Sequence, residues 1–442
     1  MPLAASNKQI LKELFRFSAP MILTSMSAVL MSVVDSMMVG RLGVTELAAI
    51  AFAGSIYILG VISGQGMASG FSTVFAAACA KRDHAQKREL FASGLAVQVG
   101  LGLLVTAFLW AFLSLPFHYG QTEAVSDFAK DYLWILSGFL ALNLMAQTFK
   151  TVLVCHDNTL GPMVIVYVAA LLNVGLNFCL IFGWGGFPAM GIKGAALATG
   201  ISQVFSLLVL VVLVYRNHQL TPLGIFKDAD SEQMKQIAKI GGAFAFQWLI
   251  EVAAFTASAT IIGKFSEVHL AAHQISLNVT SLMFMIPAAM GAAATIKISA
   301  ARSTDPPPAV RNRALLYLLV TVGVSFVTAS FMFATRNLIP SLYTDSVAVT
   351  EVATTILMIA ACFQLADGLQ GVASGILRGY RDIKIPTAII SLCWWFFTLP
   401  LGYYLSAIKG LGATGMWLGL TTGIVSASIL LCLRLKVVSS RV

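Results

Sequence analysis

Long apolar runs constrain this chain more than any other feature of its sequence. Each run is close to or above the roughly 20 residues that an α-helix needs to cross a bilayer. The runs lack the period-two alternation of barrel strands, so we expect helices. With 58% hydrophobic and only 11% charged residues, the chain has too much apolar surface for a soluble protein. The runs predict twelve spans, at 17–38, 46–75, 92–116, 131–154, 162–184, 193–215, 240–262, 271–297, 313–336, 349–377, 386–406 and 412–434.

The lysines and arginines predict how these spans are oriented. When the loops are assigned alternately to the two sides, 22 of the 28 basic residues fall on the side of the N-terminus. The positive-inside rule makes that side the cytoplasm, and an even number of spans then places both termini there. We therefore predict a multi-pass protein of the bacterial inner membrane. Because the basic residues flank the spans, the net charge of +9 does not indicate a nucleic-acid partner.

The two halves of the chain resemble each other, which predicts an internal duplication. GRLGVTELAA begins at Gly40 and GKFSEVHLAA begins at Gly263, while DNTLGP ends at Pro162 and RDIKIP ends at Pro386, at nearly the same offset. The alternative is that any two membrane halves share patterns of small residues. Six spans per half is an even number, so both halves would enter the membrane in the same orientation. We predict two pseudo-symmetric six-helix bundles, an N-terminal lobe over 1–220 and a C-terminal lobe over 221–442, with a cytoplasmic linker at 216–239.

Three carboxyl groups lie inside spans, where charges are costly. Asp35 lies in the first span, Glu251 in the seventh and Asp367 in the tenth, and none has a basic residue in the core of its own span. A charged side chain at the bilayer centre costs about 2.5–3.5 kcal/mol on the insertion scale, and such groups usually face a cavity, a proton path or an ion. The alternative is a protonated carboxyl that hydrogen-bonds a neighbouring helix. We predict that the three acids couple transport to a proton or a cation.

Polar and adaptable side chains accompany these acids. Asn173 and Asn177 are four residues apart and so share one helix face, and Thr199 in the next span is positioned to join them. Asn pairs in spans also serve as contacts between helices, and that reading stays open. In the eighth span, Asn278 belongs to a polar stripe, and Met283 and Phe284 belong to a cluster suited to variable apolar ligands. Packing and lipid contact are the alternative role of that cluster.

Several functional classes lack their sequence signatures. The chain contains no GxxxxGK[ST] run for an ATP-driven motor and no HExxH, GxSxG or CxxC motif of an enzyme or metal site. It contains no TVGYG-like filter of a channel. We therefore expect a transporter that is not an enzyme, with no cofactor and no bound structural metal.

The motifs resemble those of the MATE (multidrug and toxic compound extrusion) family, NorM branch, over nearly the whole chain. In the first half they are SAPMILTSMSAVLMSVVDSMMVGRLG, ALLNVGLNFCLIFG and GIKGAALAT. In the second half they are FQWLIEVAAF, LAAHQISLNVTSLMFMIPAAMGAAATI and FQLADGLQGVASGILRGYRD. The resemblance implies two six-helix bundles forming a V. It also implies an exporter that exchanges a proton or sodium ion for organic, often cationic, hydrophobic drugs by alternating access.

The resemblance also implies roles for particular residues. Asp35 matches the acidic residue of the first lobe, and Glu251 and Asp367 match the acidic pair of the second. Phe363 stands where NorM-type sodium sites often have a Tyr, and Asn177 stands where some sodium sites have a second Asp. Both differences remove oxygen ligands, so proton coupling is favoured, with sodium left open at Asp35 or at the acidic pair. The implied coupling set is Asp35, Asn173, Asn177, Thr199, Glu251 and Asp367, and the implied substrate or cavity-lining set is Asn278, Met283, Phe284 and Phe363.

Two other functional classes are alternatives to an exporter. A flippase for lipid-linked oligosaccharides or lipids of the same superfamily would need cationic residues in the span cores, and the sequence places none there. A structural or receptor-like membrane protein would need neither buried carboxyls nor a repeat. The expected partners are small-molecule drugs and the lipid bilayer, and the expected state is a monomer.

Overall fold

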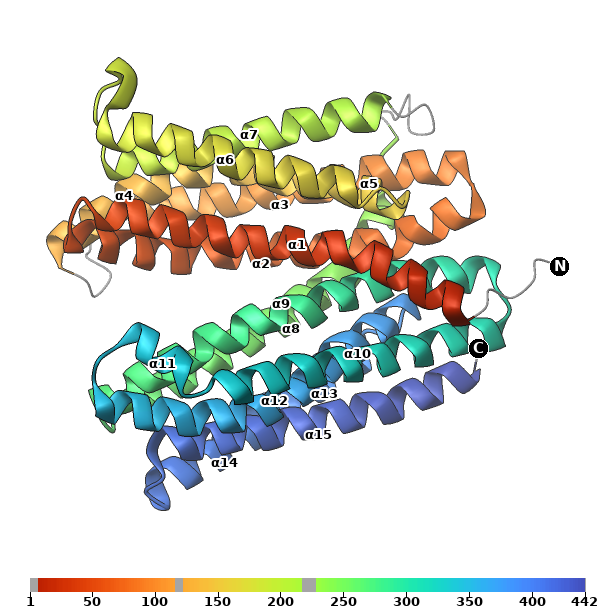
Figure 1. The fold of residues 1–442 in the computed structure, drawn as a ribbon. Helices are drawn as coiled ribbons and strands as arrows, with labels where there is room; N and C mark the ends of the chain where they lie inside the picture. The colour runs from red at the N-terminus through yellow and green to blue at the C-terminus, as the bar shows by residue number, and fades with distance from the viewer. Residues whose placement is uncertain (1–6, 116–121, 217–227, 442) are drawn as a thin grey trace. The chain divides into compact units, whose positions relative to one another are not determined.

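The computed structural model describes residues 7–115, 122–216 and 228–441, and those residues form helices and connecting loops without a β-strand. In each half of the chain, long helices lie side by side (Figure 1). The first half contains α1 (Asn7–Gly40), α2 (Val44–Lys81), α3 (His84–Leu113), α4 (Glu123–Gly138), α5 (Leu140–Cys155), α6 (Leu160–Phe182) and α7 (Ile192–Arg216). The second half contains α8 (Ser231–Gly263), α9 (Glu267–Thr304), α10 (Pro307–Thr335), α11 (Leu338–Tyr343), α12 (Val347–Gly379), α13 (Lys384–Leu392), α14 (Leu399–Tyr403) and α15 (Gly412–Arg441).

These helices confirm the predicted all-α membrane architecture. Eleven helical stretches are long and apolar enough to cross a membrane, and the bent pair α4 and α5 makes a twelfth. That pair bends by 43° at Phe139, next to Gly138, and glycines are common at sharp kinks. The stretch at 384–408 contains two π-helical segments on either side of α14. Pro400 lies in that short helix, and a proline disturbs the regular helical hydrogen bonds.

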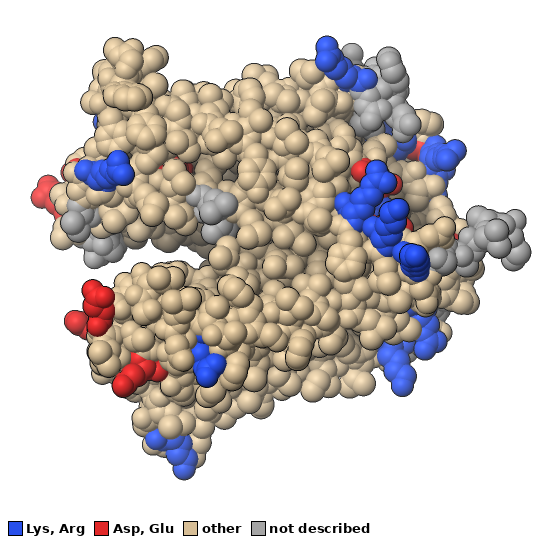
Figure 2. Space-filling view, in the orientation of Figure 1, with Lys and Arg blue, Asp and Glu red and all other residues tan. Residues whose placement is uncertain are grey.

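Charged side chains lie toward the ends of the helices in both halves of the chain (Figure 2). On the face that Figure 2 shows, the surface between the helix ends is almost entirely uncharged. The exposed side chains of the helices include many large apolar ones, such as Leu104, Leu171 and Phe396. In a soluble protein such a surface would promote aggregation, whereas in a bilayer it contacts acyl chains. The distribution matches the composition that predicted a membrane protein.

The helices pack into two compact units whose boundaries differ from the predicted lobes. One unit, the N-unit, comprises Leu23–Ala245, and the other, the C-unit, comprises Met1–Ile22 together with Phe246–Val442. Helix α1 therefore contributes its first half to the C-unit, and α8 contributes its first half to the N-unit. The repeat motifs identify duplicated sequence, but they carry no information on which bundle the start of each repeat packs against. The lobes at 1–220 and 221–442 thus stay a prediction about sequence duplication.

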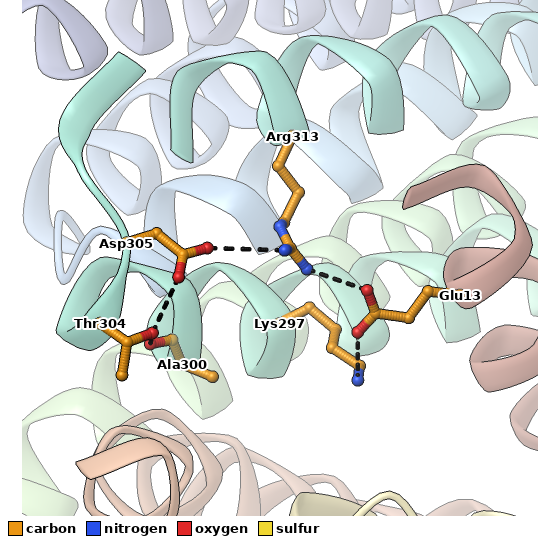
Figure 3. A network of polar contacts seen from close by, with 6 residues as sticks. All are labelled: Glu13, Lys297, Ala300, Thr304, Asp305 and Arg313. Carbon is orange, nitrogen blue, oxygen red and sulfur yellow. Dashed lines mark hydrogen bonds and ion pairs between the residues drawn. The ribbon is translucent and has the colours of Figure 1, made fainter. Parts of the chain in front are cut away.

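The first half of α1 is fixed to the C-unit by apolar and ionic contacts. Ile10 and Leu14 are buried in its hydrophobic core. The Glu13 carboxylate accepts from Lys297 Nζ at 2.7 Å and from Arg313 Nη1 at 3.2 Å (Figure 3). Lys297 Nζ also lies 4.5 Å from the centre of the Phe17 ring, a cation–π contact. One acidic residue of α1 thus joins α9 and α10.

The first half of α8 packs closely against α2 within the N-unit. A Cβ atom at Gly70 would lie 2.5 Å from the Ile237 carbonyl oxygen, and one at Gly66 would lie 2.5 Å from the Ala245 Cβ. Both distances are too short for any side chain, so glycine is required for this approach of the two backbones. Small residues are the usual means of close helix packing in membranes, where lipid removes the hydrophobic driving force.

The C-unit core is built on an equally close contact between α9 and α12. A Cβ atom at Gly375 would overlap the carbonyl oxygen of Gly291, and one at Gly379 would lie 2.8 Å from the Cβ of Ile298. Thr295 Oγ1 donates to the Gly375 carbonyl at 2.9 Å, across the same interface. The two helices therefore approach through glycines and are linked by a side-chain hydrogen bond.

We expect Gly375→Ala to destabilise the protein, because the new methyl group must push the α12 and α9 backbones apart. Overpacking a tight interior typically costs about 1–3 kcal/mol. The measurement is the apparent melting temperature of the purified protein in detergent. Gly323→Ala in α10 is the matched control, since nothing lies within 4 Å of a Cβ placed there. Equal melting temperatures for the two variants would contradict the close-contact interpretation.

Candidate functional site

The N-unit brings together the four polar residues that the sequence singled out in its half of the chain. Asp35 on α1 is 7% exposed, and Asn173 and Asn177 on α6 are fully buried. Asn177 Nδ2 donates to Asp35 Oδ1 at 2.6 Å and to Asn173 Oδ1 at 3.2 Å. Thr199 Oγ1 on α7 lies 3.4 Å from Asp35 Oδ2 and 3.4 Å from Asn173 Nδ2. The four side chains form one closed cluster between three helices.

This cluster offers a carboxylate within a shell of neutral groups. Both oxygens of Asp35 accept hydrogen bonds, which favours the charged form, while burial disfavours it. Asn177 Oδ1 is buried and has no hydrogen-bond partner among the described residues. If Asp35 carried a proton, rotation of the Asn177 amide would bring this oxygen into the place of Nδ2 as an acceptor. The group can therefore hold either form of Asp35 with a local exchange of hydrogen bonds.

Tyr132 on α4 is a neighbour of this cluster that the sequence did not single out. It is 6% exposed and interacts electrostatically with Asp35 and with Tyr57 on α2. Tyr57 in turn accepts a hydrogen bond from Gln203 Nε2 on α7 at 3.5 Å. Tyr132 was overlooked because a Tyr in an apolar span resembles an ordinary interfacial aromatic residue. Two tyrosines and a glutamine thus extend the polar cluster through the N-unit.

The C-unit brings together the other two predicted acids. Asp367 on α12 is 8% exposed, and Glu251 on α8 is half-buried. The two carboxyls lie close enough to interact electrostatically. Gln247, one turn earlier on α8, donates from Nε2 to Glu251 Oε1 at 3.1 Å. The C-unit therefore contains a coupled acidic pair, whereas the N-unit cluster has one acid.

Arg378 is a charged neighbour of the acidic pair that the sequence did not reveal. Its position in the sequence predicts a residue that flanks the membrane, but its side chain is only 6% exposed, and it interacts electrostatically with Glu251. Its Nη1 also donates to Ser374 Oγ at 3.1 Å. Arg378 directly follows the predicted span 349–377 and lies in the last turn of α12, so a buried basic residue borders the core of that span.

The spacing along α12 explains the position of Arg378. Asp367, Gln370, Ser374 and Arg378 recur every three or four residues, so they share one face of the helix. All four are buried. This stripe runs from the acidic pair to the end of α12 at Gly379, and its spacing is the signal that would have indicated a polar face in the sequence.

The predicted substrate-lining residues have unequal environments. Asn278 on α9 is exposed, and Met283 and Phe284 on the same helix are half-buried. Phe363 is 1% exposed, and its ring packs against Phe255 at 6.4 Å and Trp417 at 5.8 Å between centroids. Phe363 thus belongs to an aromatic cluster in the C-unit core. A role of these four predicted residues in drug binding stays a prediction.

Comparison with known proteins agrees with this architecture. The MatE family model matches residues 20–179 and 243–404. The chain is 31% identical over 438 residues to multidrug resistance protein PmpM of Pseudomonas aeruginosa, covering 96% of this chain and 91% of the relative. It is 28% identical over 450 residues to a probable multidrug resistance protein NorM of Idiomarina loihiensis, covering 99% and 96%.

Solved structures confirm the predicted fold class. A MOP superfamily transporter from Pyrococcus furiosus superposes with a TM-score of 0.90 at 19% identity, over 99% of this chain and 97% of that one. The eukaryotic MATE transporter AtDTX14 superposes with a TM-score of 0.84 at 19% identity, over 98% of both chains. At this identity the likeness shows the fold alone.

Proposed function

This chain belongs to the MatE family, whose model matches most of its length, and on that premise we propose that it exports drugs as a secondary active antiporter. Its relatives of similar length are named multidrug resistance proteins, which supports organic drugs as substrates. The transported compounds would be hydrophobic and often cationic, and they would be exchanged for a cation by alternating access. The protein would work without a cofactor, as a monomer in the bacterial inner membrane with both termini in the cytoplasm.

The observation that carries this proposal is the placement of buried acids in both units. A membrane protein with a purely structural role gains nothing from carboxyls that cost free energy to bury. Here Asp35 lies in one polar cluster, and Glu251 and Asp367 lie in another. A lipid-linked oligosaccharide flippase is the less favoured alternative, because the buried Arg378 interacts with Glu251 and so is already engaged by an acid.

We propose the proton as the coupling ion, with sodium as the alternative. The N-unit cluster has a single carboxylate, and its remaining ligands are two amides and one hydroxyl. Phe363 provides no oxygen to the acidic pair and is packed among aromatic rings. Cation sites usually gather more oxygen ligands than this, whereas a proton needs only one acid and a partner to receive its hydrogen bond.

The acidic pair would also use Arg378 as an internal counter-ion. When no coupling ion is bound, the guanidinium stabilises the charged form of Glu251. When an ion binds the pair, it neutralises the same charge, so the ion and Arg378 compete. This competition would keep the ion weakly enough bound to be released at the end of each cycle.

The test is a flux measurement with the purified full chain in proteoliposomes. An imposed proton gradient is expected to drive accumulation of a fluorescent cationic dye, and addition of a drug is expected to release protons. Parallel vesicles carry a sodium gradient at equal pH on both sides. Dye transport driven by sodium alone would overturn proton coupling, and transport driven by neither gradient would overturn the antiport proposal.

A further inference from the structure

Three arginines meet at one end of the C-unit, and none has an acidic partner in the part of the chain that the structure describes. Arg302 lies in the last turn of α9, Arg311 in the first part of α10, and Arg381 in the link between α12 and α13. All three side chains are exposed. Arg302 Nη1 donates to the carbonyl oxygen of Tyr380 at 2.6 Å, so it lies directly beside Arg381. Arg302 and Arg311 both interact electrostatically with the Tyr380 hydroxyl.

The acidic side chains of this region form ion pairs with other basic side chains. Asp305 accepts from Arg313 at 3.5 Å, and Glu13 is shared by Lys297 and Arg313, as Figure 3 shows. Asp382, which directly follows Arg381, accepts from Arg434 at 2.6 Å. Among the described residues, Arg302, Arg311 and Arg381 form no ion pair. Partial burial and then the neighbouring charge of Arg302 lower the pKa of Arg381, so the like charges here repel each other.

An apolar stripe begins at one of these arginines. Arg311 is followed on the same face of α10 by Leu315, Leu319, Val322 and Phe326, at spacings of three or four residues. These four side chains are 46–67% exposed, and α10 is a membrane span. The stripe is thus suited to contact an acyl chain. A cationic group at the end of such a stripe lies where phospholipid headgroups begin.

We propose that Arg302, Arg311 and Arg381 bind the phosphate of an anionic phospholipid whose acyl chain lies along the exposed stripe of α10. Arginine matches a phosphate well, because its planar guanidinium donates two parallel hydrogen bonds. Basic sites at the ends of transmembrane helices are known to select anionic headgroups. A phosphate would offset the repulsion among the three guanidinium groups. The site does not depend on the proposed transport activity.

The test compares lipid binding by the purified full chain and two triple variants in native mass spectrometry. The probes are phosphatidylglycerol and zwitterionic phosphatidylcholine with the same acyl chains. We expect Arg302→Gln with Arg311→Gln and Arg381→Gln to weaken phosphatidylglycerol binding by about 100-fold and to leave phosphatidylcholine binding unchanged. The control is Lys81→Gln with Arg82→Gln and Lys436→Gln, which removes the same charge elsewhere. Arg82 matches Arg381, since both have a left-handed backbone conformation.

Equal phosphatidylglycerol binding by the two triple variants would overturn the proposal. Soluble glycerophosphoglycerol tests the lipid source, and it is expected not to displace the lipid, because it has no acyl chain for the α10 stripe. Displacement at concentrations similar to the lipid would overturn the stripe as part of the site. If the triple variant does not stay folded, Arg311→Gln alone removes a side chain with no hydrogen bond in the described structure. It is expected to weaken binding by about fivefold, and unchanged binding would overturn the proposal.

Discussion

Asp35→Asn is expected to lower the rate of proton-coupled drug efflux at least about tenfold while leaving the protein folded. The substitution removes the only acid of the N-unit cluster, so that site can no longer change its charge. It also places an amide where Asn177 Nδ2 and Thr199 Oγ1 now meet two acceptor oxygens. A hydrogen bond to a charged group contributes about 1.5–3 kcal/mol, which corresponds to about 10- to 100-fold in an equilibrium constant. We therefore expect the initial efflux rate to fall by at least the lower of these factors.

The measurement is the initial rate of drug efflux from vesicles over a series of pH values. Asp131→Asn is the matched control in the same unit. Asp131 pairs with Lys193 at 3.2 Å, but both side chains are about half exposed, and such surface pairs contribute little. The control is expected to keep the wild-type rate and pH profile. The same rate and profile in Asp35→Asn would show that Asp35 has no part in coupling.

Arg378→Gln is expected to strengthen binding of the coupling ion to the acidic pair and to slow its release. Without the guanidinium, a proton or cation meets no internal competitor at Glu251. An electrostatic interaction of only about 1.4 kcal/mol, modest for a buried charge, corresponds to a tenfold change in affinity. For proton coupling, half-maximal efflux should therefore move to higher pH by about one unit, because the acids are protonated more readily. The maximal rate should fall as release becomes limiting.

Two further variants separate this effect from a loss of structure. Arg378→Lys retains the positive charge and is expected to keep the wild-type pH of half-maximal efflux. In a background that carries Glu251→Gln, Arg378→Gln is expected to produce no further shift, since the interacting charge is gone. A wild-type profile in Arg378→Gln, or the same shift in both backgrounds, would contradict the role of Arg378 as counter-ion to Glu251.

The local features of the fold followed from the sequence because each depends on neighbouring residues. Apolar runs place the spans, and the i to i+4 spacing of Asn173 and Asn177 placed both amides on one face toward Asp35. The exact ends of the helices were harder to predict from the sequence. The first predicted span, 17–38, is part of a helix from Asn7 to Gly40, because hydropathy does not register a polar extension of a helix beyond the bilayer.

Contacts between distant segments account for most of what the sequence did not reveal. Arg378 interacts electrostatically with Glu251, which lies on another helix, and no pattern along the sequence links the two residues. The exchange of the first halves of α1 and α8 depends on specific partners, such as Glu13 with Lys297 and Gly70 with Ile237. Such pairing leaves no periodic signal in a single sequence. The coupling role of the clustered acids likewise remains a prediction for the experiments above.

The assignment of the first halves of α1 and α8 to the two units also determines the order in which the units can be completed during synthesis. Lys297, which pairs with Glu13, is made about 280 residues after it. At about 5–20 residues per second, the start of α1 waits tens of seconds for its partners. The N-unit has all its residues once Ala245 is made. The C-unit is completed after the N-unit, and it includes the first half of α1, which is made before either unit is complete.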